Sequence, residues 1–219
     1  MKNKLTYILM TITFLLITFF AIKYPQNLLN TVPLYVSIFV MLLQMRVNRY
    51  AFLLGGLNSL LYAAVYFYYG LYGSALYAVT VSFFLQIATF VSWKRKSYKK
   101  TATVFKTLGA KKFSLFLILF TVCWLACYNI FKRLGSSHTL LDNSIMLIGI
   151  VTSVMTMLSC VEWTYFQLLS SVLSVALYVN MIYTNPEMSA YLVYSIYSLI
   201  CTVGTLVNVR NVYKEQQRM

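Results

Sequence analysis

Eight long apolar segments follow one another along this chain, and almost no charged residue interrupts them. They cover roughly residues 5–22, 28–45, 50–69, 71–92, 113–131, 143–161, 163–183 and 188–209. A helix needs about 20 apolar residues to cross a bilayer, so each segment is long enough for one crossing. Only 10% of the residues are charged, against roughly 25% in soluble domains. The sequence therefore predicts an all-α integral membrane protein with about eight transmembrane helices.

The basic residues gather on one side of the predicted spans. With eight crossings both termini share a side, and that side carries 15 of the 18 Lys and Arg residues. Eight of the 15 fall within 94–112, whereas Lys23, Lys132 and Arg133 lie opposite. Cytoplasmic loops are rich in basic residues, so we expect cytoplasmic termini and a plasma-membrane location. The net charge of +14 then reflects orientation and contact with membrane lipids, and no nucleic-acid partner is expected.

The chain also matches itself at an offset of 116 residues. Polar, tyrosine and basic positions coincide at this offset: Ser37 with Ser153, Asn58 with Ser174, Tyr62 with Tyr178, Ser82 with Ser198, and Lys94 with Arg210. The offset pairs the second, third and fourth spans with the sixth, seventh and eighth, and leaves the fifth as a linker. An odd number of linking spans gives both units the same orientation. We therefore expect two parallel three-helix repeats, with a substrate site at their interface.

These patterns predict a division of the chain into six parts. They are an N-terminal transmembrane helix (1–27), a first three-helix repeat (28–93), a basic cytoplasmic loop (94–112), a linker helix with an outer loop (113–142), a second three-helix repeat (143–209) and a cytoplasmic tail (210–219).

Polar side chains recur at helical spacing inside several spans. Asn58, Tyr62 and Tyr66 share one face of the third span, as do Gln167, Ser174 and Tyr178 on the seventh; Tyr194 lies on the eighth and Tyr77 on the fourth. A polar group in hydrocarbon is costly unless it meets a partner or a water-filled cavity. For the serines, close helix packing is an equally good explanation. For the amides and inner tyrosines we favour a binding cavity for a flat, uncharged or weakly cationic ring that carries hydroxyls.

Carboxylates and basic groups are absent from the interiors of the predicted spans; Asp142 and Glu162 are placed at span boundaries. Proton-coupled carriers usually need a titratable group at membrane depth, so facilitated diffusion is the first expectation, while sodium coupling stays open. The four cysteines are interpreted as packing residues, and no metal or cofactor is expected. An intramembrane enzyme is disfavoured because no histidine or acid accompanies the serines, but a non-transporting receptor subunit remains an alternative.

Three blocks of sequence resemble one known family of membrane proteins. They are "GGLNSLLYAAVYFYYGLYGSALY" (55–77), "EWTYFQLLSSVLSVALY" (162–178) and "VYSIYSLICTVG" (193–204). Together they are similar to the PnuC family of vitamin transporters, best known for nicotinamide riboside, and the similarity extends over about residues 28–214.

The resemblance implies a SWEET-like fold with an extra N-terminal helix, a homotrimer, and facilitated uptake of a small-molecule substrate that is trapped by phosphorylation. It adds Trp163 and Phe166 to the expected substrate-binding residues, as the counterpart of a pair of tryptophans in the family. A family glutamine and a family acidic residue are replaced by Ala78 and Ser170. Relatives for thiamine, riboflavin and deoxynucleosides share the scaffold, so these substrates stay open beside nicotinamide riboside.

Overall fold

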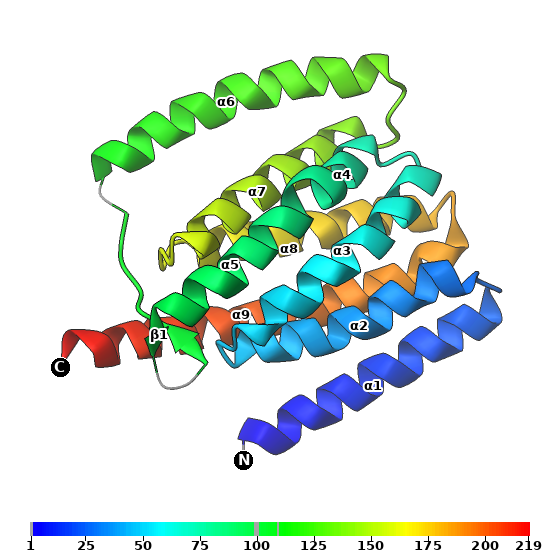
Figure 1. The fold of residues 1–219 in the computed structure, drawn as a ribbon. Coiled ribbons are helices and arrows are strands. Elements are labelled where there is room, and N and C mark those ends of the chain that lie inside the picture. The colour runs from blue at the N-terminus through cyan, green and yellow to red at the C-terminus, as the bar shows by residue number, and fades with distance from the viewer. Residues whose placement is uncertain (1, 99–100, 109) are drawn as a thin grey trace.

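The protein is described by a computed structural model that covers residues 2–98, 101–108 and 110–219 (Figure 1). Its elements, in chain order, are α1 (Lys2–Lys23), α2 (Leu28–Met45), α3 (Tyr50–Tyr68), α4 (Tyr72–Tyr77), the π-helical turn η1 (Ala78–Ser82), α5 (Phe83–Arg95), β1 (Ser97–Tyr98), β2 (Ala102–Thr103), α6 (Ala110–Arg133), α7 (Thr139–Met157), α8 (Trp163–Ile182), the 3₁₀ turn η2 (Pro186–Met188) and α9 (Ser189–Gln217).

Seven of the described helical segments are long and apolar enough to cross a membrane, with α4, η1 and α5 forming one continuous span. The eighth, α6, lies on the outside of the bundle and packs against α7 (Figure 1). The all-helical fold is thus as predicted, and most helix ends fall within a few residues of their expected places. Two segments are exceptions, because α7 begins at Thr139, ahead of the expected residue 143, and α9 continues to Gln217, past the expected residue 209.

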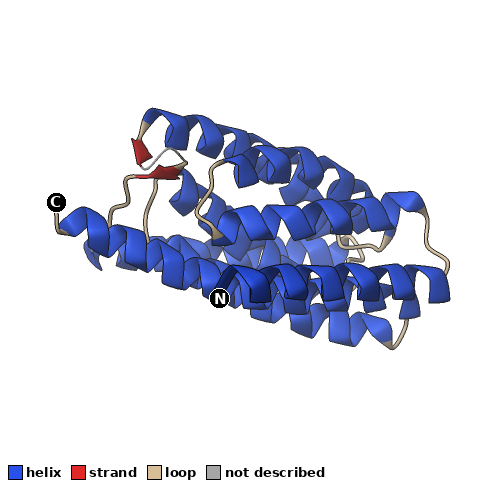
Figure 2. Ribbon diagram, turned by 90° about the horizontal axis from the view of Figure 1, so that it is seen from below, coloured by secondary structure: helices blue, strands red, loops and turns tan. Residues whose placement is uncertain are grey.

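The spans form two groups of three helices with α6 between them in the chain. In the first group α3 packs against both α2 and α5, and in the second α8 packs against both α7 and α9. The groups meet where α2 contacts α9 and where α5 contacts α7, and α1 lies outside against α9 and α2 (Figures 1 and 2). Both termini lie toward the end of the bundle that carries β1 and β2, which we call the hairpin end (Figure 1).

A fully buried carboxylate joins the two groups at the opposite end of the bundle. Asp142, in the first turn of α7, accepts hydrogen bonds from the backbone N–H groups of Gly73 and Ser74, each at 2.9 Å. The hydroxyls of Ser74 and Ser136 donate to the same carboxylate. The first N–H groups of a helix have no partner inside it, so Asp142 caps α4 from another helix. The sequence placed this residue at a span boundary, and the structure adds that it is a buried contact between two spans.

The segment after α5 is folded onto the hairpin end rather than left as a free loop. β1 and β2 pair antiparallel, with Ser97 opposite Thr103. Phe105 is buried beside Trp93, and the side chain of Gln216 in α9 accepts from the N–H of Phe105 and donates to the carbonyl of Thr103. The predicted basic loop (94–112) falls in part on residues 99, 100 and 109, which lie outside the described residues.

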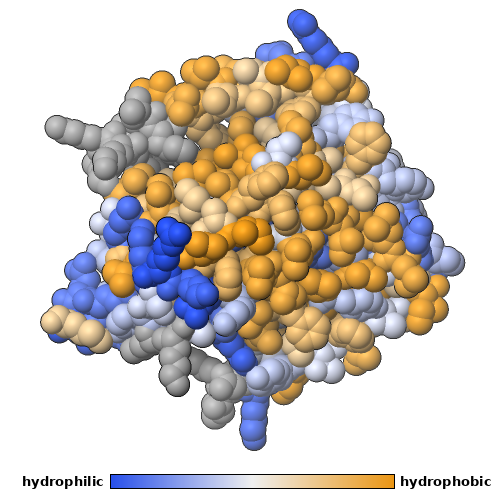
Figure 3. Space-filling view, viewed as in Figure 1, coloured by the Kyte–Doolittle hydropathy of each residue, from blue (hydrophilic) through white to orange (hydrophobic). Residues whose placement is uncertain are grey.

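The surface agrees with a membrane location. In Figure 3, apolar side chains cover the middle of the visible face, and hydrophilic groups gather on its left part and along its rim. Exposed apolar residues such as Leu57, Phe67, Phe84 and Val122 contribute to a lipid-compatible exterior.

Candidate substrate-binding cavity

A cavity of about 280 Å³ lies between the two three-helix groups. Its lining comes from α2, α3, α4, η1, α5, α7, α8 and α9, and the described lining residues include none from α1 or α6. Pockets for small ligands start at roughly 300 Å³. The cavity is therefore close to the size that a compact organic molecule needs.

Nine of the ten residues that the sequence singled out line this cavity. They are Asn58, Tyr62, Tyr66, Tyr77, Trp163, Gln167, Ser174, Tyr178 and Tyr194. Phe166 is not among the lining residues, and it packs instead against the apolar cluster at the hairpin end. The structure thus brings together side chains from both groups and leaves out one of the two aromatic residues suggested by the family pattern.

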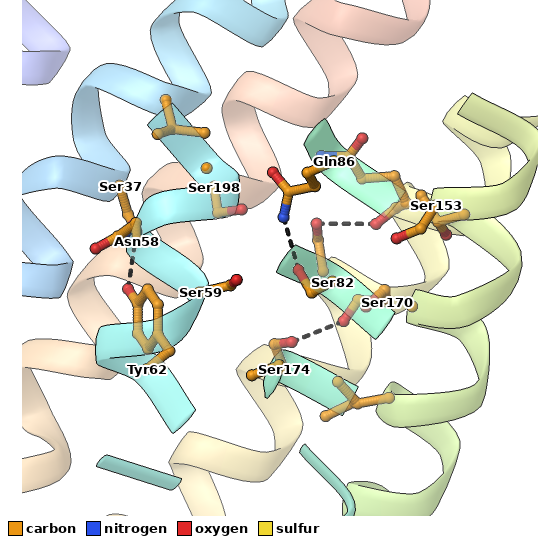
Figure 4. Close-up of a pocket in the computed structure, with 18 of the residues that line it drawn as sticks. Ser37, Asn58, Ser59, Tyr62, Ser82, Gln86, Ser153, Ser170, Ser174 and Ser198 are labelled. Carbon is orange, nitrogen blue, oxygen red and sulfur yellow. Dashed lines mark hydrogen bonds between the residues drawn. The ribbon is translucent and has the colours of Figure 1, made fainter. Parts of the chain in front are cut away.

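On the α3 wall, Asn58 is held by α2. Its Nδ2 donates to the carbonyl of Pro33 at 2.9 Å and to Ser37 Oγ at 2.8 Å. Ser37 Oγ in turn donates to the hydroxyl of Tyr62 at 2.9 Å (Figure 4). The rings of Tyr62 and Tyr66 stack with centroids 5.4 Å apart. The buried Asn58 Oδ1 has no hydrogen-bond partner among the described residues. The amide is thus fixed by its nitrogen, with its oxygen unused.

The α8 wall repeats this arrangement with different residues. Gln167 Nε2 donates to Gln44 Oε1 of α2 at 2.8 Å, which ties the second group to the first. Gln167 Oε1 and the Nε1–H of Trp163 are both buried, and neither has a partner in the described part of the chain. Buried polar groups are normally paired, and an orphan in a cavity is a place where a ligand can supply the missing partner.

Tyr77 joins the two groups inside the cavity. Its hydroxyl lies 2.7 Å from Ser153 Oγ and donates to the carbonyl of Gly149 at 3.1 Å, both on α7. A Cβ at Gly149 would come within 2.9 Å of the Tyr77 ring, so the missing side chain lets the ring pack closely against α7. Tyr77 is therefore both a wall of the cavity and a contact between the groups.

Positions related by the 116-residue offset meet at the cavity. Four such pairs line it, namely Ser37 with Ser153, Asn58 with Ser174, Tyr62 with Tyr178, and Ser82 with Ser198. A site at the interface of two parallel repeats predicts this arrangement, since equivalent residues then face each other.

The cavity is polar without being charged. Its described lining residues include several serines, threonines and tyrosines, together with Asn58, Gln44, Gln86 and Gln167, but no Asp, Glu, Lys, Arg or His. No group of three or more metal-ligating side chains occurs in the described part of the chain. The arrangement can hold a neutral or weakly cationic ligand by stacking and hydrogen bonding, and it offers nothing to balance a phosphate.

A family model matches residues 27–208, and its family is described as that of the nicotinamide mononucleotide transporter. The chain belongs to this transporter family. The match includes both three-helix groups, so the cavity lies within the part of the chain that defines the family.

The fold is also that of a solved relative. The crystal structure of the vitamin B3 transporter PnuC superposes with a TM-score of 0.80 at 20% sequence identity, over 96% of this chain and 90% of the other. No curated protein matches the sequence. At this identity the superposition establishes the transporter fold of the chain and leaves its substrate to be argued from the cavity.

Two polar residues of the cavity, Gln44 and Gln86, were not predicted from the sequence of this transporter-family chain. Gln44 lies in the last turn of α2, and the rule that polar groups inside spans need a partner would have found it. Gln86 was visible as a polar residue in the fourth span, but no helical stripe connected it to Tyr77. The reason lies in the π-helical turn between them.

Proposed function

We propose that the protein carries a vitamin or nucleoside across the plasma membrane by facilitated diffusion, and that its substrate is nicotinamide riboside. The observation that carries this proposal is the cavity, which has aromatic walls, unpartnered amide oxygens and an indole donor, but no charged side chain among its described lining. Ribose hydroxyls supply hydrogen-bond donors for the oxygens, and a pyridinium ring is attracted to aromatic faces.

The same observation disfavours a phosphorylated substrate. Proteins that bind phosphate esters use Arg, Lys or clustered backbone N–H groups. The lining offers none of these cationic side chains, so the nucleoside is a better fit than the mononucleotide in the family's description. Phosphorylation in the cytoplasm would then trap the substrate, because the product no longer fits the cavity.

Transport itself is proposed to occur by alternating access, with the two three-helix groups rocking about the cavity. Polar contacts between the groups are present at both ends of the cavity, at Asp142 on one side and at Trp93 on the other, where the indole donates to the carbonyl of Thr156. Opening one end while the other stays closed would expose the substrate to one side at a time. We further propose cytoplasmic termini, on the charge pattern, and a homotrimer, on the family resemblance.

The test is uptake by purified protein in liposomes. A panel of nicotinamide riboside, nicotinamide mononucleotide, thiamine, riboflavin and deoxynucleosides is offered to proteoliposomes and to empty liposomes. Nicotinamide riboside should equilibrate fastest and the mononucleotide no faster than in empty liposomes. Faster uptake of another panel member would assign the site to that vitamin or nucleoside, and no accelerated uptake of any compound would refute the proposal.

A further inference from the structure

Gln86 projects from α5 into the middle of the cavity (Figure 4). Its Nε2 donates to Ser82 Oγ, one turn earlier, at 2.7 Å. This bond fixes the plane of the carboxamide and turns Oε1 toward α3. No hydrogen bond to Gln86 Oε1 is present among the described residues, although an amide oxygen can accept two. The oxygen is therefore an acceptor that is oriented by the protein and available to a ligand.

The position of this oxygen depends on a missing side chain in α3. A Cβ placed on Gly55 would overlap with Gln86 Oε1 and lie 3.3 Å from its Cδ. The next residue is different, because a Cβ on Gly56 would lie 3.3 Å from Ile87 Cδ1 and 3.4 Å from Gln86 Cβ, contacts that small shifts can relieve. Gly55 thus makes room for the carboxamide, whereas Gly56 makes room for close packing of α3 on α5.

The π-helical turn η1 decides which residue of α5 faces the cavity. Successive residues of a regular α-helix are turned by about 100°, so Gln86 would point roughly 80° away from Ala78 and Leu85 only about 20° away. A π-helical turn accommodates one additional residue. It therefore brings Gln86, instead of Leu85, onto the face of Ala78, and Ala78, Ser82 and Gln86 all line the cavity.

From these observations we infer that Gln86 is a substrate-contacting residue, whose Oε1 accepts a hydrogen bond from a hydroxyl or carboxamide of the ligand. Gly55 is its positioning residue. This inference rests on the proposed function and deepens it, because it names a recognition contact that the polar stripes of the sequence did not include. It also accounts for the glycine at position 55 of the cavity wall, two turns before Tyr62, because a larger residue there would occupy the space of the Gln86 carboxamide.

The experiment is a double-mutant cycle on uptake of nicotinamide riboside by proteoliposomes. Gln86→Ala should raise KM about three- to tenfold, the effect of one lost neutral hydrogen bond. Gly55→Ala should raise KM by a similar factor, and the double variant should be no worse than either single one. Gly56→Ala is the matched control and should stay within about twofold of the wild type, because the tightest contact of the added Cβ is to the mobile end of the Ile87 side chain and none is to the carboxamide of Gln86.

A second measurement separates recognition from folding. Gly55→Ala should lower the melting temperature of the ligand-free protein, and this loss should disappear when Gln86→Ala removes the overlap. Each variant is also tested with 2′-deoxy, 3′-deoxy and 5′-deoxy analogues and with nicotinic acid riboside. For the analogue that lacks the relevant donor, wild type and Gln86→Ala should have the same KM.

Wild-type KM in the Gln86→Ala variant would overturn this inference alone. Multiplicative losses in the Gly55→Ala/Gln86→Ala double variant would overturn the role of Gly55. Sensitivity to Gln86→Ala that persists with every analogue would show that the amide does not contact the ligand. Failure of the wild-type protein to transport any compound of the panel would instead refute the proposed function, and this inference with it.

Discussion

At the scale of single residues, the cavity depends on side chains that are held by one polar atom and leave another unused. Asn58 and Gln167 both donate through their amide nitrogens to α2 and leave a buried oxygen without a described partner. Trp163 is only 1% exposed, and its Nε1–H has no described partner. Such atoms are costly in the empty state and gain most from a ligand that pairs them, which favours specific binding.

Replacing Trp163 by alanine should weaken substrate binding while the protein still folds. Stacking of a flat ring on an aromatic side chain contributes about 1–3 kcal/mol, so we expect roughly a tenfold or greater loss of affinity. The measurement is ligand binding by calorimetry on detergent-solubilised protein, with gel filtration to check folding.

The matched control is Phe166→Ala, because Phe166 lies on the same helix but outside the described cavity lining. It should leave affinity close to that of the wild type. Equal losses in both variants would contradict the assignment of the cavity wall to Trp163.

The stripe of Asn58, Tyr62 and Tyr66 could be predicted from the sequence because polar residues at spacings of four share a helix face and cannot face lipid. The environment of Phe166 could not be predicted, since an apolar ring can face lipid, the protein core or a cavity. The unpaired atoms were also beyond sequence reasoning, because they depend on which nitrogen meets which carbonyl in the folded chain.

At the scale of elements, the fold contains a contact that the sequence pattern did not predict, in which a residue of one helix caps the start of another. α4 has no side-chain cap of its own, and Asp142 of α7 supplies it from the other group. From the sequence, Asp142 was expected only at a span boundary, because a carboxylate inside a membrane helix is rare without partners. Four groups donate to this carboxylate. Three of them, on Gly73 and Ser74, are far away in the sequence, and the fourth, on Ser136, lies in the short connection before α7, so no local pattern shows them.

Removal of the Asp142 carboxylate should destabilise the protein. Asp142→Ala leaves buried N–H groups unpaired, and we expect a loss of about 2–4 kcal/mol in the free energy of unfolding, since hydrogen bonds to charged groups are the strong ones. Asp142→Asn keeps one acceptor oxygen and should lose less. Melting curves in detergent measure both, with Ser144→Ala, whose hydroxyl contacts α6, as a control. A wild-type melting temperature for Asp142→Ala would argue against this cap.

The π-helical turn η1 was likewise invisible to the sequence. Hydrophobic periodicity reports an average of 3.6 residues per turn, and one extra residue within a span of apolar side chains leaves that average almost unchanged. The orientation of Gln86 therefore had to come from the structure.

At the scale of the whole molecule, the two three-helix groups are linked at both ends and enclose an uncharged cavity between them. The hairpin end is fastened by residues 101–108, whose backbone bonds to α9 and to the side chain of Glu162 before α8. The sequence indicated a basic loop at this place, and lysines and arginines alone could not show that its apolar residues Ala102 and Phe105 are buried. Span count and topology, in contrast, follow from the bilayer's demand for long apolar helices.

Transport should not depend on a proton or sodium gradient. The described lining has no titratable carboxylate or imidazole through which a proton could be coupled to the substrate. Uptake into proteoliposomes, with the membrane potential held at zero by potassium and valinomycin, should be the same with and without a gradient of pH or sodium. A severalfold change in initial rate on imposing either gradient would contradict facilitated diffusion.

The uncharged cavity has an electrical consequence of its own. Nicotinamide riboside, the proposed substrate, carries a permanent positive charge, and the described lining has no acidic side chain that would neutralise this charge during the crossing. Each crossing would then transfer one elementary charge, so the membrane voltage acts on the substrate directly. A potential of about 100 mV, negative inside, contributes roughly 2.3 kcal/mol per charge, equivalent to about a 50-fold accumulation. A carrier with no ion-coupling machinery could in this way concentrate a cationic vitamin before any kinase acts on it.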